Sequence, residues 1–262
     1  MYLTFKKPSR LPLLSAGVAA MALLCLAPGV HAEESGAAFN AAQKKEIESM
    51  IQAYILDNPD VLLKSLQAGQ AKEAQQRQLD AQTAISSNLE ALTDANAPSI
   101  GNPDADVTIV EFFDYNCGYC KRALPDIQNI LKADNNVRFV FREMPILGPT
   151  SRTASQWALA AHKQGKYFDY HVALMSYKGP KNEEVLAKIA KDTGLDVERL
   201  RKDAQSEAVQ AEIERDVALA RSIGISGTPA FIVGETLIPG YVGEDGLKQS
   251  IKDARADTGK DG

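Results

Sequence analysis

Residues Val107 to Cys120, VTIVEFFDYNCGYC, join a strand-like run to a pair of cysteines. The run VTIVEFF is rich in β-branched and aromatic residues, which is typical of a strand that is covered on both faces. Beyond Cys120, apolar residues recur at helical spacing, at Ala123, Leu124, Ile127, Ile130 and Leu131. We therefore expect Cys117 near a helix N-terminus, where free N–H groups and the helix dipole favour a thiolate.

The first 32 residues have the pattern of a secretory signal peptide. Lys6, Lys7 and Arg10 precede an apolar run from Leu11 to Ala27, and Val-His-Ala follows at 30–32. We expect cleavage before Glu33 and export of the mature chain. The alternative is an uncleaved membrane anchor, although the run is shorter than the roughly 20 apolar residues that a span requires.

The charge of the chain argues against a nucleic-acid partner. The whole chain has a formal net charge of −5, and loss of the three positive charges in residues 1–32 takes it to −8. Such an acidic chain has no basic patch for a phosphate backbone. The roughly 230 residues that remain allow one large domain or a domain with a smaller appendage.

The exported chain has only two cysteines, Cys117 and Cys120, because Cys25 lies inside the predicted signal peptide. A structural disulfide usually closes a long loop, and a Cys-x-x-Cys ring removes little loop entropy. We therefore expect a redox pair, with Cys117 as the attacking thiolate and Cys120 as the more buried resolving thiol. A zinc site needs four ligands, so no metal site is expected, and copper(I) held by two thiolates is the minor alternative.

Glu111 lies inside the apolar strand, six residues before Cys117. A buried carboxyl without a partner has a raised pKa, and beside a buried thiol it is a candidate proton acceptor for Cys120. The alternative is a carboxylate at a sheet edge that faces water.

Residues 33–97 predict helices that cannot form a core alone. One apolar stripe runs through Ile47, Met50, Ile51, Tyr54 and Ile55, and Asn58-Pro59 ends that helix and begins the next. Residues 67–78 are polar and form either an exposed helix or a flexible arm, and a sparse stripe resumes at Leu79. The stripes must pack somewhere, either on the catalytic part of the same chain or, as we favour, on another copy.

The remaining sequence alternates between strands and helices. Residues 97–103 are rich in Pro, Gly and Asn and predict a boundary, and residues 142–149 predict a loop. The strand at 107–113 and a second at 137–141 form a right-handed strand–helix–strand unit with parallel strands. Helices are expected at 153–162, 167–175, 183–192, 197–203, 207–223 and 245–256, with Trp157 in the core, and a hairpin at 230–233 and 236–238.

The strand with Glu111, the CGYC motif, the helix and the late Gly-Thr-Pro at 227–229 together resemble the thioredoxin fold. The helices at about 150–223 resemble the insertion of the DsbA-like branch of exported thiol-disulfide oxidoreductases, and the likeness covers about residues 98–256. It implies an α/β thioredoxin fold with an inserted helical domain, preceded by an N-terminal α-helical extension. The implied divisions are a signal peptide at 1–32, an oligomerisation segment and linker at 33–97, and a DsbA-like domain at 98–262.

The resemblance also implies a substrate site. In this family the proline of Gly-Thr-Pro is cis and lies against the cysteines, so Pro229 is expected there and Thr228 presents its backbone to a substrate peptide. Gly118 and Tyr119, between the cysteines, are further candidates for substrate contact. No cofactor is expected.

The dipeptide Gly118-Tyr119 lacks the histidine of DsbA and is similar to that of DsbC-type isomerases, and the helical extension resembles that of ScsC-like and Com1-like members. The leading hypothesis is a periplasmic disulfide isomerase or reductase, a dimer or trimer through residues 33–97. It would act on misfolded or reduced exported proteins and be reset by a DsbD-like or DsbB-like membrane partner. The alternatives are a net dithiol oxidase of DsbA type and, from a different class, a copper(I)-binding or adhesion protein without exchange chemistry.

Overall fold

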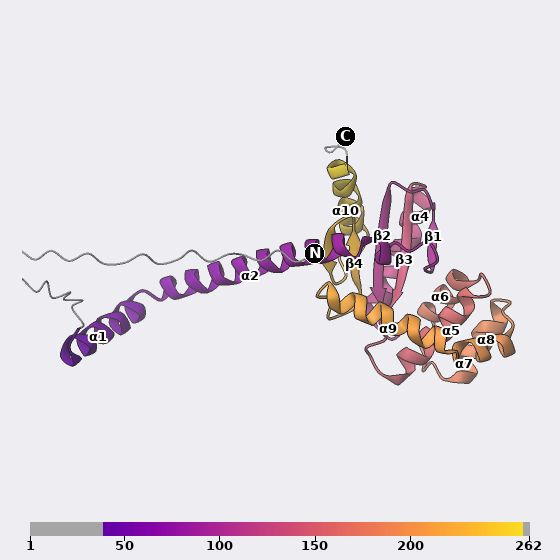
Figure 1. Cartoon of the computed structure of the whole chain (residues 1–262), viewed down its shortest axis with the longest axis horizontal. Coiled ribbons are helices and arrows are strands. Elements are labelled where there is room, and N and C mark those ends of the chain that lie inside the picture. Colours follow the sequence, from indigo (N-terminus) through magenta and orange to yellow (C-terminus); the bar gives the residue numbers. More distant parts are fainter. Residues whose placement is uncertain (1–38, 259–262) are drawn as a thin grey trace, which may run out of the picture. The chain divides into compact units, whose positions relative to one another are not determined.

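The computed structural model of the chain describes residues 39–258 (Figure 1). The chain divides between Val61 and Leu62 into two compact units. The predicted signal peptide and its cleavage site lie outside the described residues. Within residues 39–258, no helix combines the length and apolar character that crossing a membrane requires.

A five-stranded sheet in the order β1-β3-β2-β4-β5 forms the centre of the second unit. β2 and β3 are parallel, and the three other pairs are antiparallel. The predicted parallel unit and the predicted hairpin, β4–β5, are therefore confirmed. The strands are β1 (Ser99–Gly101), β2 (Val107–Phe113), β3 (Val137–Glu143), β4 (Ala230–Val233) and β5 (Thr236–Pro239).

β2 lies inside the sheet, with β3 on one side and β4 on the other. Six of its seven residues are buried, and Thr108 alone is partly exposed. A strand that is paired at both edges and covered on both faces has no solvent-facing position, which explains its nearly continuous apolar sequence. Glu111 is its one charged residue and lies in register with Phe141 and Phe231.

Helices cover both faces of the sheet (Figure 1). On one face, α4 (Gly118–Ala133) and α10 (Gly243–Thr258) pack on Ile109, Phe139 and Phe231. On the other face, the end of α2 (Pro59–Ser87), the short α3 (Leu89–Leu92) and the end of α9 (Glu207–Ser222) pack on Val110, Val140 and Ile232. The strands β2, β3 and β4 thus contribute side chains to two different hydrophobic clusters, one on each face of the sheet.

The helical block between β3 and β4 agrees with the sequence prediction to within a few residues. α5 begins at Pro149, earlier than expected, because Gly148 takes a φ of 113° and Pro149 stands at the first helical position. Trp157 is buried in the core as predicted. The block comprises α5 (Pro149–His162), α6 (Tyr167–Ser176), α7 (Glu183–Asp192), α8 (Val197–Ala204) and α9.

Two segments expected to be loops belong instead to strands. Ser99–Gly101 forms the edge strand β1, in which Gly101 has a φ of 103° and approaches the Val137 carbonyl so closely that a Cβ would lie 2.3 Å from its oxygen. The second is Arg142-Glu143, which extends β3 and is buried. The Glu143 carboxyl accepts hydrogen bonds from the Tyr167 hydroxyl at 2.9 Å and the Ser155 hydroxyl at 2.7 Å. Burial nevertheless raises the pKa of this carboxyl well above its ordinary value.

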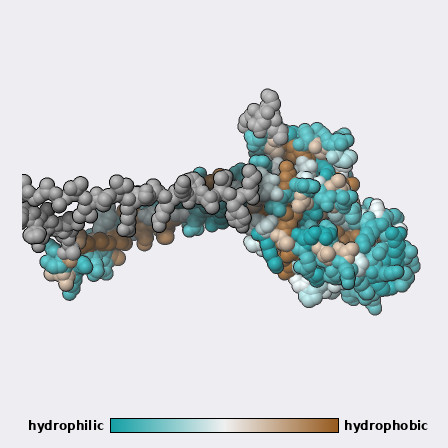
Figure 2. All heavy atoms as spheres, viewed as in Figure 1, coloured by the Kyte–Doolittle hydropathy of each residue, from teal (hydrophilic) through white to brown (hydrophobic). Residues whose placement is uncertain are grey.

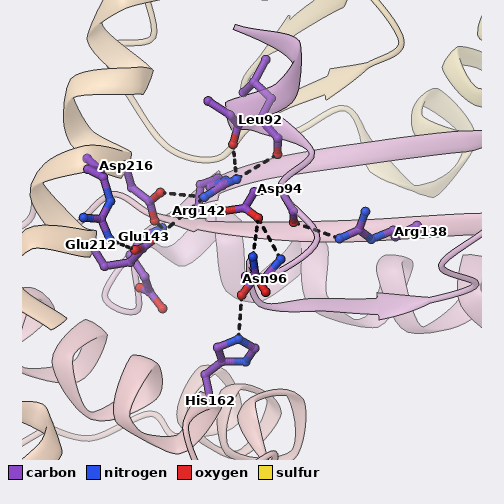
Figure 3. A network of polar contacts seen from close by, with 11 residues as sticks. Leu92, Asp94, Asn96, Arg138, Arg142, Glu143, His162, Glu212 and Asp216 are labelled. Atoms are coloured by element: carbon purple, nitrogen blue, oxygen red, sulfur yellow. Dashed lines mark hydrogen bonds and ion pairs between the residues drawn. The ribbon is translucent and has the colours of Figure 1, made fainter. Parts of the chain in front are cut away.

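Arg142 joins β3 to α9 and to the end of α3 (Figure 3). Its guanidinium lies 3.1 Å from Asp216 Oδ1 and donates to the carbonyls of Ala91 and Leu92. Asp216 Oδ2 in turn accepts the Glu143 backbone N–H at 2.9 Å. The last carbonyls of a helix have no partner within the helix, so these bonds satisfy the end of α3 while fixing it to the sheet.

The chain just after α3 is held in the same way. The Arg138 guanidinium donates to the Thr93 and Asp94 carbonyls at 3.2 and 3.1 Å, and His162 Nε2 lies 2.9 Å from the Asn96 carbonyl oxygen (Figure 3). Residues 91–96 are therefore attached by side chains from β3 and α5.

The two N-terminal helices form as predicted. α1 (Ala41–Asp57) has a capping box between Asn40 and Gln43, and it ends at Asn58 before Pro59 begins α2. α2 continues through the polar residues 67–78 as an exposed helix. No residue of α1 is buried, and the apolar surface appears brown in Figure 2 where α1 ends and α2 begins. The exposed apolar side chains here include Met50, Ile51, Tyr54, Ile55, Leu62, Leu63 and Leu66.

Replacing Arg142 with methionine tests the buried ion pair. Arg142→Met leaves the Asp216 carboxylate buried without its partner, and we expect a loss of about 3–5 kcal/mol in unfolding free energy. The control is Arg152→Met, which breaks the exposed pair with Glu214 at 2.7 Å and is expected to cost at most about 1 kcal/mol. Guanidinium chloride unfolding measures both, and equal losses would contradict the prediction.

Candidate functional site

Cys117 lies where the turn after β2 meets the start of α4. It is the N-cap residue of α4, its N–H donates to the Asp114 carbonyl at 3.0 Å, and its carbonyl accepts the Lys121 N–H at 3.2 Å. When protonated, its Sγ donates to the Thr228 carbonyl oxygen at 3.3 Å, across 111 residues of sequence. The sulfur thus faces both the helix start, as predicted, and the segment before β4.

The turn before Cys117 is held by the buried carboxylate of Asp114. It accepts hydrogen bonds from the Asn116 N–H at 2.7 Å, the Ser151 hydroxyl at 2.7 Å and the Leu147 N–H at 2.9 Å. These donors come from the turn itself, from α5 and from the loop that precedes α5. The helical block therefore helps to fix the position of Cys117.

Cys117 has the properties of an activated thiol. A hydrogen bond from the Cys120 thiol lowers its pKa to about 5, against the opposing effect of burial. Hydrogen bonds from the Thr228 side chain and from the backbone N–H groups of Cys120 and Tyr119 lower the pKa of Cys117 as well. Cys117 is therefore a thiolate at neutral pH.

Cys120 has the opposite character. It is 1% exposed, and burial, the hydrogen bond to Cys117 and the charge of Glu111 all raise the pKa of its thiol. Both cysteines are free in the structure, so the pair is described in its dithiol form. One helical turn thus separates a thiolate that is 7% exposed from a protonated thiol that is 1% exposed.

Glu111 is buried, at 1% exposure, and does not face water at a sheet edge. Its Oε1 has no hydrogen-bond partner. Burial, and secondarily the charge of Cys117, raise its pKa to about 8. A carboxyl that titrates near neutral pH and interacts electrostatically with Cys120 is suited to accept that thiol's proton.

The Thr228-Pro229 peptide bond is cis, as the family resemblance implied. Pro229 is buried and its carbonyl accepts the Gly240 N–H at 3.0 Å, while Thr228 is partly exposed with its carbonyl at the Cys117 sulfur. The structure thus brings the predicted residues Cys117, Cys120 and Thr228 together.

Gly118 and Tyr119 are exposed at the start of α4. A Cβ added to Gly118 would meet nothing within 4 Å, and Tyr119 is 56% exposed. The centroid of the Tyr119 ring lies 6.2 Å from the centroid of the Tyr241 ring. It lies 5.1 Å from Cζ of Arg122. The dipeptide is accessible to a large partner beside the sulfur.

Sequence reasoning missed the polar residues that support the turn, among them Asn116, Ser151 and Lys181. The Asn116 side chain donates to the Thr150 and Ser151 hydroxyls at 2.9 and 2.8 Å and accepts from Lys181 at 3.3 Å. Nothing in their local sequence marks them, because the contacts join distant segments. Within residues 39–258, no group of three or more His, Cys, Asp or Glu side chains is placed to hold a metal ion.

Family comparison identifies the fold of this site. The model of the DsbA-like thioredoxin domain matches residues 108–252, which include both cysteines and the cis proline. The chain belongs to this family. The model of the N-terminal domain of copper resistance protein ScsC matches residues 43–76, in α1 and α2.

Solved structures and curated relatives agree with this assignment. A thioredoxin-like oxidoreductase from Silicibacter pomeroyi is 48% identical, with 64% of this chain and 97% of that chain covered and a TM-score of 0.62. ScsC of Proteus mirabilis, in a transitional conformation, is 32% identical with 84% and 99% covered and a TM-score of 0.62. Disulfide bond formation protein D of Bacillus subtilis is 30% identical, with 59% and 75% covered. The chain spans about a quarter (24%) of the first curated relatives that it matches, which are Na⁺/H⁺ antiporters of Salinispora.

Replacing Cys120 tests the origin of the Cys117 thiolate. Cys120→Ala removes the thiol hydrogen bond that contributes most to the lowered pKa, so the pKa of Cys117 should rise from about 5 toward its ordinary value of 9. The matched control is Cys120→Ser, whose hydroxyl can still donate and should hold the pKa nearer to 5. Ultraviolet absorbance of the thiolate against pH measures both, and identical titrations in the two variants would contradict the prediction.

Glu111 makes the stability of the reduced protein depend on pH. Its pKa is higher in the folded chain, about 8, than the ordinary 4.5, so its stabilising contribution is complete below pH 4.5 and is lost as pH rises toward 8. The shift corresponds to at most about 5 kcal/mol. We expect Glu111→Gln to remove this decline, and urea unfolding at about pH 5 and about pH 8 tests it. An equal decline in both proteins would contradict the assignment.

Proposed function

We propose that the protein catalyses thiol-disulfide exchange on exported proteins, with Cys117 as the nucleophile and Cys120 as the resolving thiol. The observation that carries the proposal is the contrast within one helical turn between Cys117, a thiolate that accepts a hydrogen bond from Cys120, and Cys120, a protonated thiol that is 1% exposed. Exchange requires both a thiolate that attacks and a second thiol that releases the mixed disulfide.

The reaction begins when the Cys117 thiolate attacks one sulfur of a substrate disulfide. A Cys117–substrate disulfide forms, the substrate S–S bond breaks, and the second substrate sulfur leaves as a thiolate. In isomerisation, another substrate thiolate then attacks the mixed disulfide and releases Cys117 unchanged. In reduction, the Cys120 sulfur attacks the Cys117 sulfur of the mixed disulfide and its proton passes to the ionised form of Glu111. The Cys117–Cys120 disulfide forms, the bond to the substrate breaks, and the second substrate sulfur also leaves as a thiolate. The two substrate thiolates then take protons from Glu111 and from solvent.

The exposed groups around Cys117 provide the substrate contacts. The Thr228 backbone lies at the edge of the site beside the buried cis Pro229, where an extended peptide can add as a strand. Gly118 leaves space beside the sulfur, and the exposed Tyr119 offers an apolar surface.

We favour isomerase or reductase activity over net oxidation. An isomerase must meet its substrate with Cys117 as a thiolate, which the lowered pKa ensures at neutral pH. The exposed apolar surface on α1 and the match to the ScsC N-terminal domain support a dimer or trimer through residues 33–97. Several active sites in one assembly raise their effective concentration at a misfolded substrate.

The second candidate is a net dithiol oxidase of the DsbA type. A stabilised thiolate favours the dithiol form and makes the enzyme disulfide more oxidising, so the low pKa of Cys117 also suits this direction. A copper(I)-binding role through the two thiolates is a weaker alternative. Its support is the ScsC model match to residues 43–76 and the chemistry of a thiolate pair.

The proposed setting is the periplasm, reached by means of a cleaved signal peptide at residues 1–32. The proposed organisation keeps residues 33–97 as the oligomerisation segment and 98–262 as the catalytic domain, with an insertion at about 150–223. Misfolded or reduced exported proteins are the proposed substrates. A DsbD-like membrane partner would return two electrons after each reduction, and a DsbB-like partner would serve the oxidase alternative.

Charges placed on α1 test the isomerase and the assembly together. Ile51→Glu with Ile55→Glu disrupts the apolar stripe without entering the core, because both side chains are exposed in the single chain. We expect this variant to sediment as a monomer, to keep the wild-type thiolate titration and to lose most reactivation of scrambled ribonuclease. The control, Gln52→Glu with Ala53→Glu, adds the same charge beside the stripe and should behave as wild type.

The same assays distinguish the alternatives. A monomeric wild-type protein would remove the oligomer proposal. A reduced wild-type protein that fails to reactivate scrambled ribonuclease would remove the isomerase proposal. Rapid oxidation of reduced ribonuclease by the disulfide form would then identify the oxidase, and failure of both reactions would refute thiol-disulfide exchange.

A further inference from the structure

Lys181 is a buried cation beside the active-site turn. It lies in the loop between α6 and α7 and is 1% exposed. Within residues 39–258, no carboxylate lies within 4.0 Å of its ammonium group. Lysine is almost never fully buried without an ionic partner, because removing the charge from water is costly. The cost of burying the Lys181 charge must therefore be offset by other interactions of the ammonium group.

The Lys181 ammonium donates to Asn116, the residue directly before Cys117. The bond from Nζ to Asn116 Oδ1 is 3.3 Å. The Asn116 amide donates to the Ser151 hydroxyl at 2.8 Å, and Ser151 donates to the Asp114 carboxylate at 2.7 Å. Lys181 thus belongs to the hydrogen-bonded network that fixes the turn Asp114 to Cys117, and it brings a positive charge to that turn.

Two other charged groups act on Lys181. Burial and then the charge of Lys121, which follows Cys120 on α4, lower the pKa of Lys181 to about 8, while Asp114 acts in the opposite direction. The Lys121 ammonium donates to the Tyr177 carbonyl at 3.1 Å, at the end of α6. Lys121 and Lys181 are therefore held close together. The nearby Asp114 carboxylate is bound by three other hydrogen-bond donors. The Cys117 thiolate adds a second negative charge at this turn.

We propose that Lys181 is a positioning residue for Cys117, whose buried positive charge, held through Asn116, orients the turn and stabilises the Cys117 thiolate. The inference rests on the proposed exchange function and deepens it. The α6–α7 loop is far from the CGYC motif in sequence. Through Lys181, this loop would affect the equilibrium between the dithiol and disulfide forms of the enzyme. Stabilising the thiolate stabilises that dithiol form relative to the Cys117–Cys120 disulfide.

Replacing Lys181 with methionine tests the proposal, because methionine keeps an unbranched side chain only one atom shorter and removes the charge. We expect the pKa of Cys117 to rise by about one unit, the lower end of the effect of a nearby opposite charge. The equilibrium with glutathione should move severalfold, up to about tenfold, toward the enzyme disulfide. Lys181→Arg should remain close to wild type. Lys178→Met removes an exposed charge from the same loop and should change neither quantity.

Further variants separate charge from structure. Lys181→Gln retains a donor for Asn116 without the charge and should reproduce the effect of Lys181→Met, and it replaces that variant if methionine prevents folding. An unchanged Cys117 titration and glutathione equilibrium in folded Lys181→Gln, judged by circular dichroism, would overturn the proposal. The thiolate titration needs no substrate, so a protein that failed every ribonuclease assay would still show the shift if Lys181 acts on Cys117.

Discussion

The Cys117 sulfur lies at the meeting point of three parts of the chain: the turn after β2, the first N–H groups of α4, and the carbonyl of Thr228, 111 residues further along. The sheet creates this meeting point. β2 pairs with β3 on one side and β4 on the other, so the end of β2 and the residues before β4 must lie side by side. The buried Asp114 carboxylate then fixes the turn between them.

The reactivity of the site depends on the different environments of Cys117, Cys120 and Glu111. Cys117 is stabilised as an anion by hydrogen bonds from Cys120, from the Thr228 side chain and from the start of α4, whereas burial raises the pKa of the Cys120 thiol and of the Glu111 carboxyl. An unpartnered buried carboxyl destabilises the fold, so a residue such as Glu111 is expected only where function requires it. The two thiols and the carboxyl thus have distinct roles because burial and hydrogen bonding differ around each.

The sequence predicted best those elements whose pattern of apolar residues reflects directly how they are buried in the fold. VTIVEFF is apolar because β2 is covered on both faces, and the amphipathic run after Cys120 is α4, so both elements and the position of Cys117 were predictable. The strand β1 was missed because Gly101 reads as a turn residue, whereas it serves a close approach to Val137. Arg142 and Glu143 read as loop residues because their buried partners, Asp216 and Ser155, lie elsewhere in the sequence. Lys181 was missed for the same reason.

The N-terminal helices α1, α2 and α3 contain no cysteine and differ in how far their apolar side chains are buried. Their apolar side chains are exposed on α1 and the start of α2, whereas Ile85 near the end of α2 and Leu92 of α3 are buried against the sheet. Arg138 and Arg142 of β3 donate to the carbonyls of Thr93 and Leu92, so β3 holds the residues that precede β1.

The central claim, that Cys117 attacks and Cys120 resolves, is tested most directly by mass spectrometry of adducts with a peptide disulfide near neutral pH. The Cys120→Ser variant should accumulate a stable mixed disulfide at Cys117. The Cys117→Ser variant should form almost none, because its remaining thiol is buried and protonated. Rapid formation of an adduct at Cys120, at a rate similar to that at Cys117, would contradict the assignment.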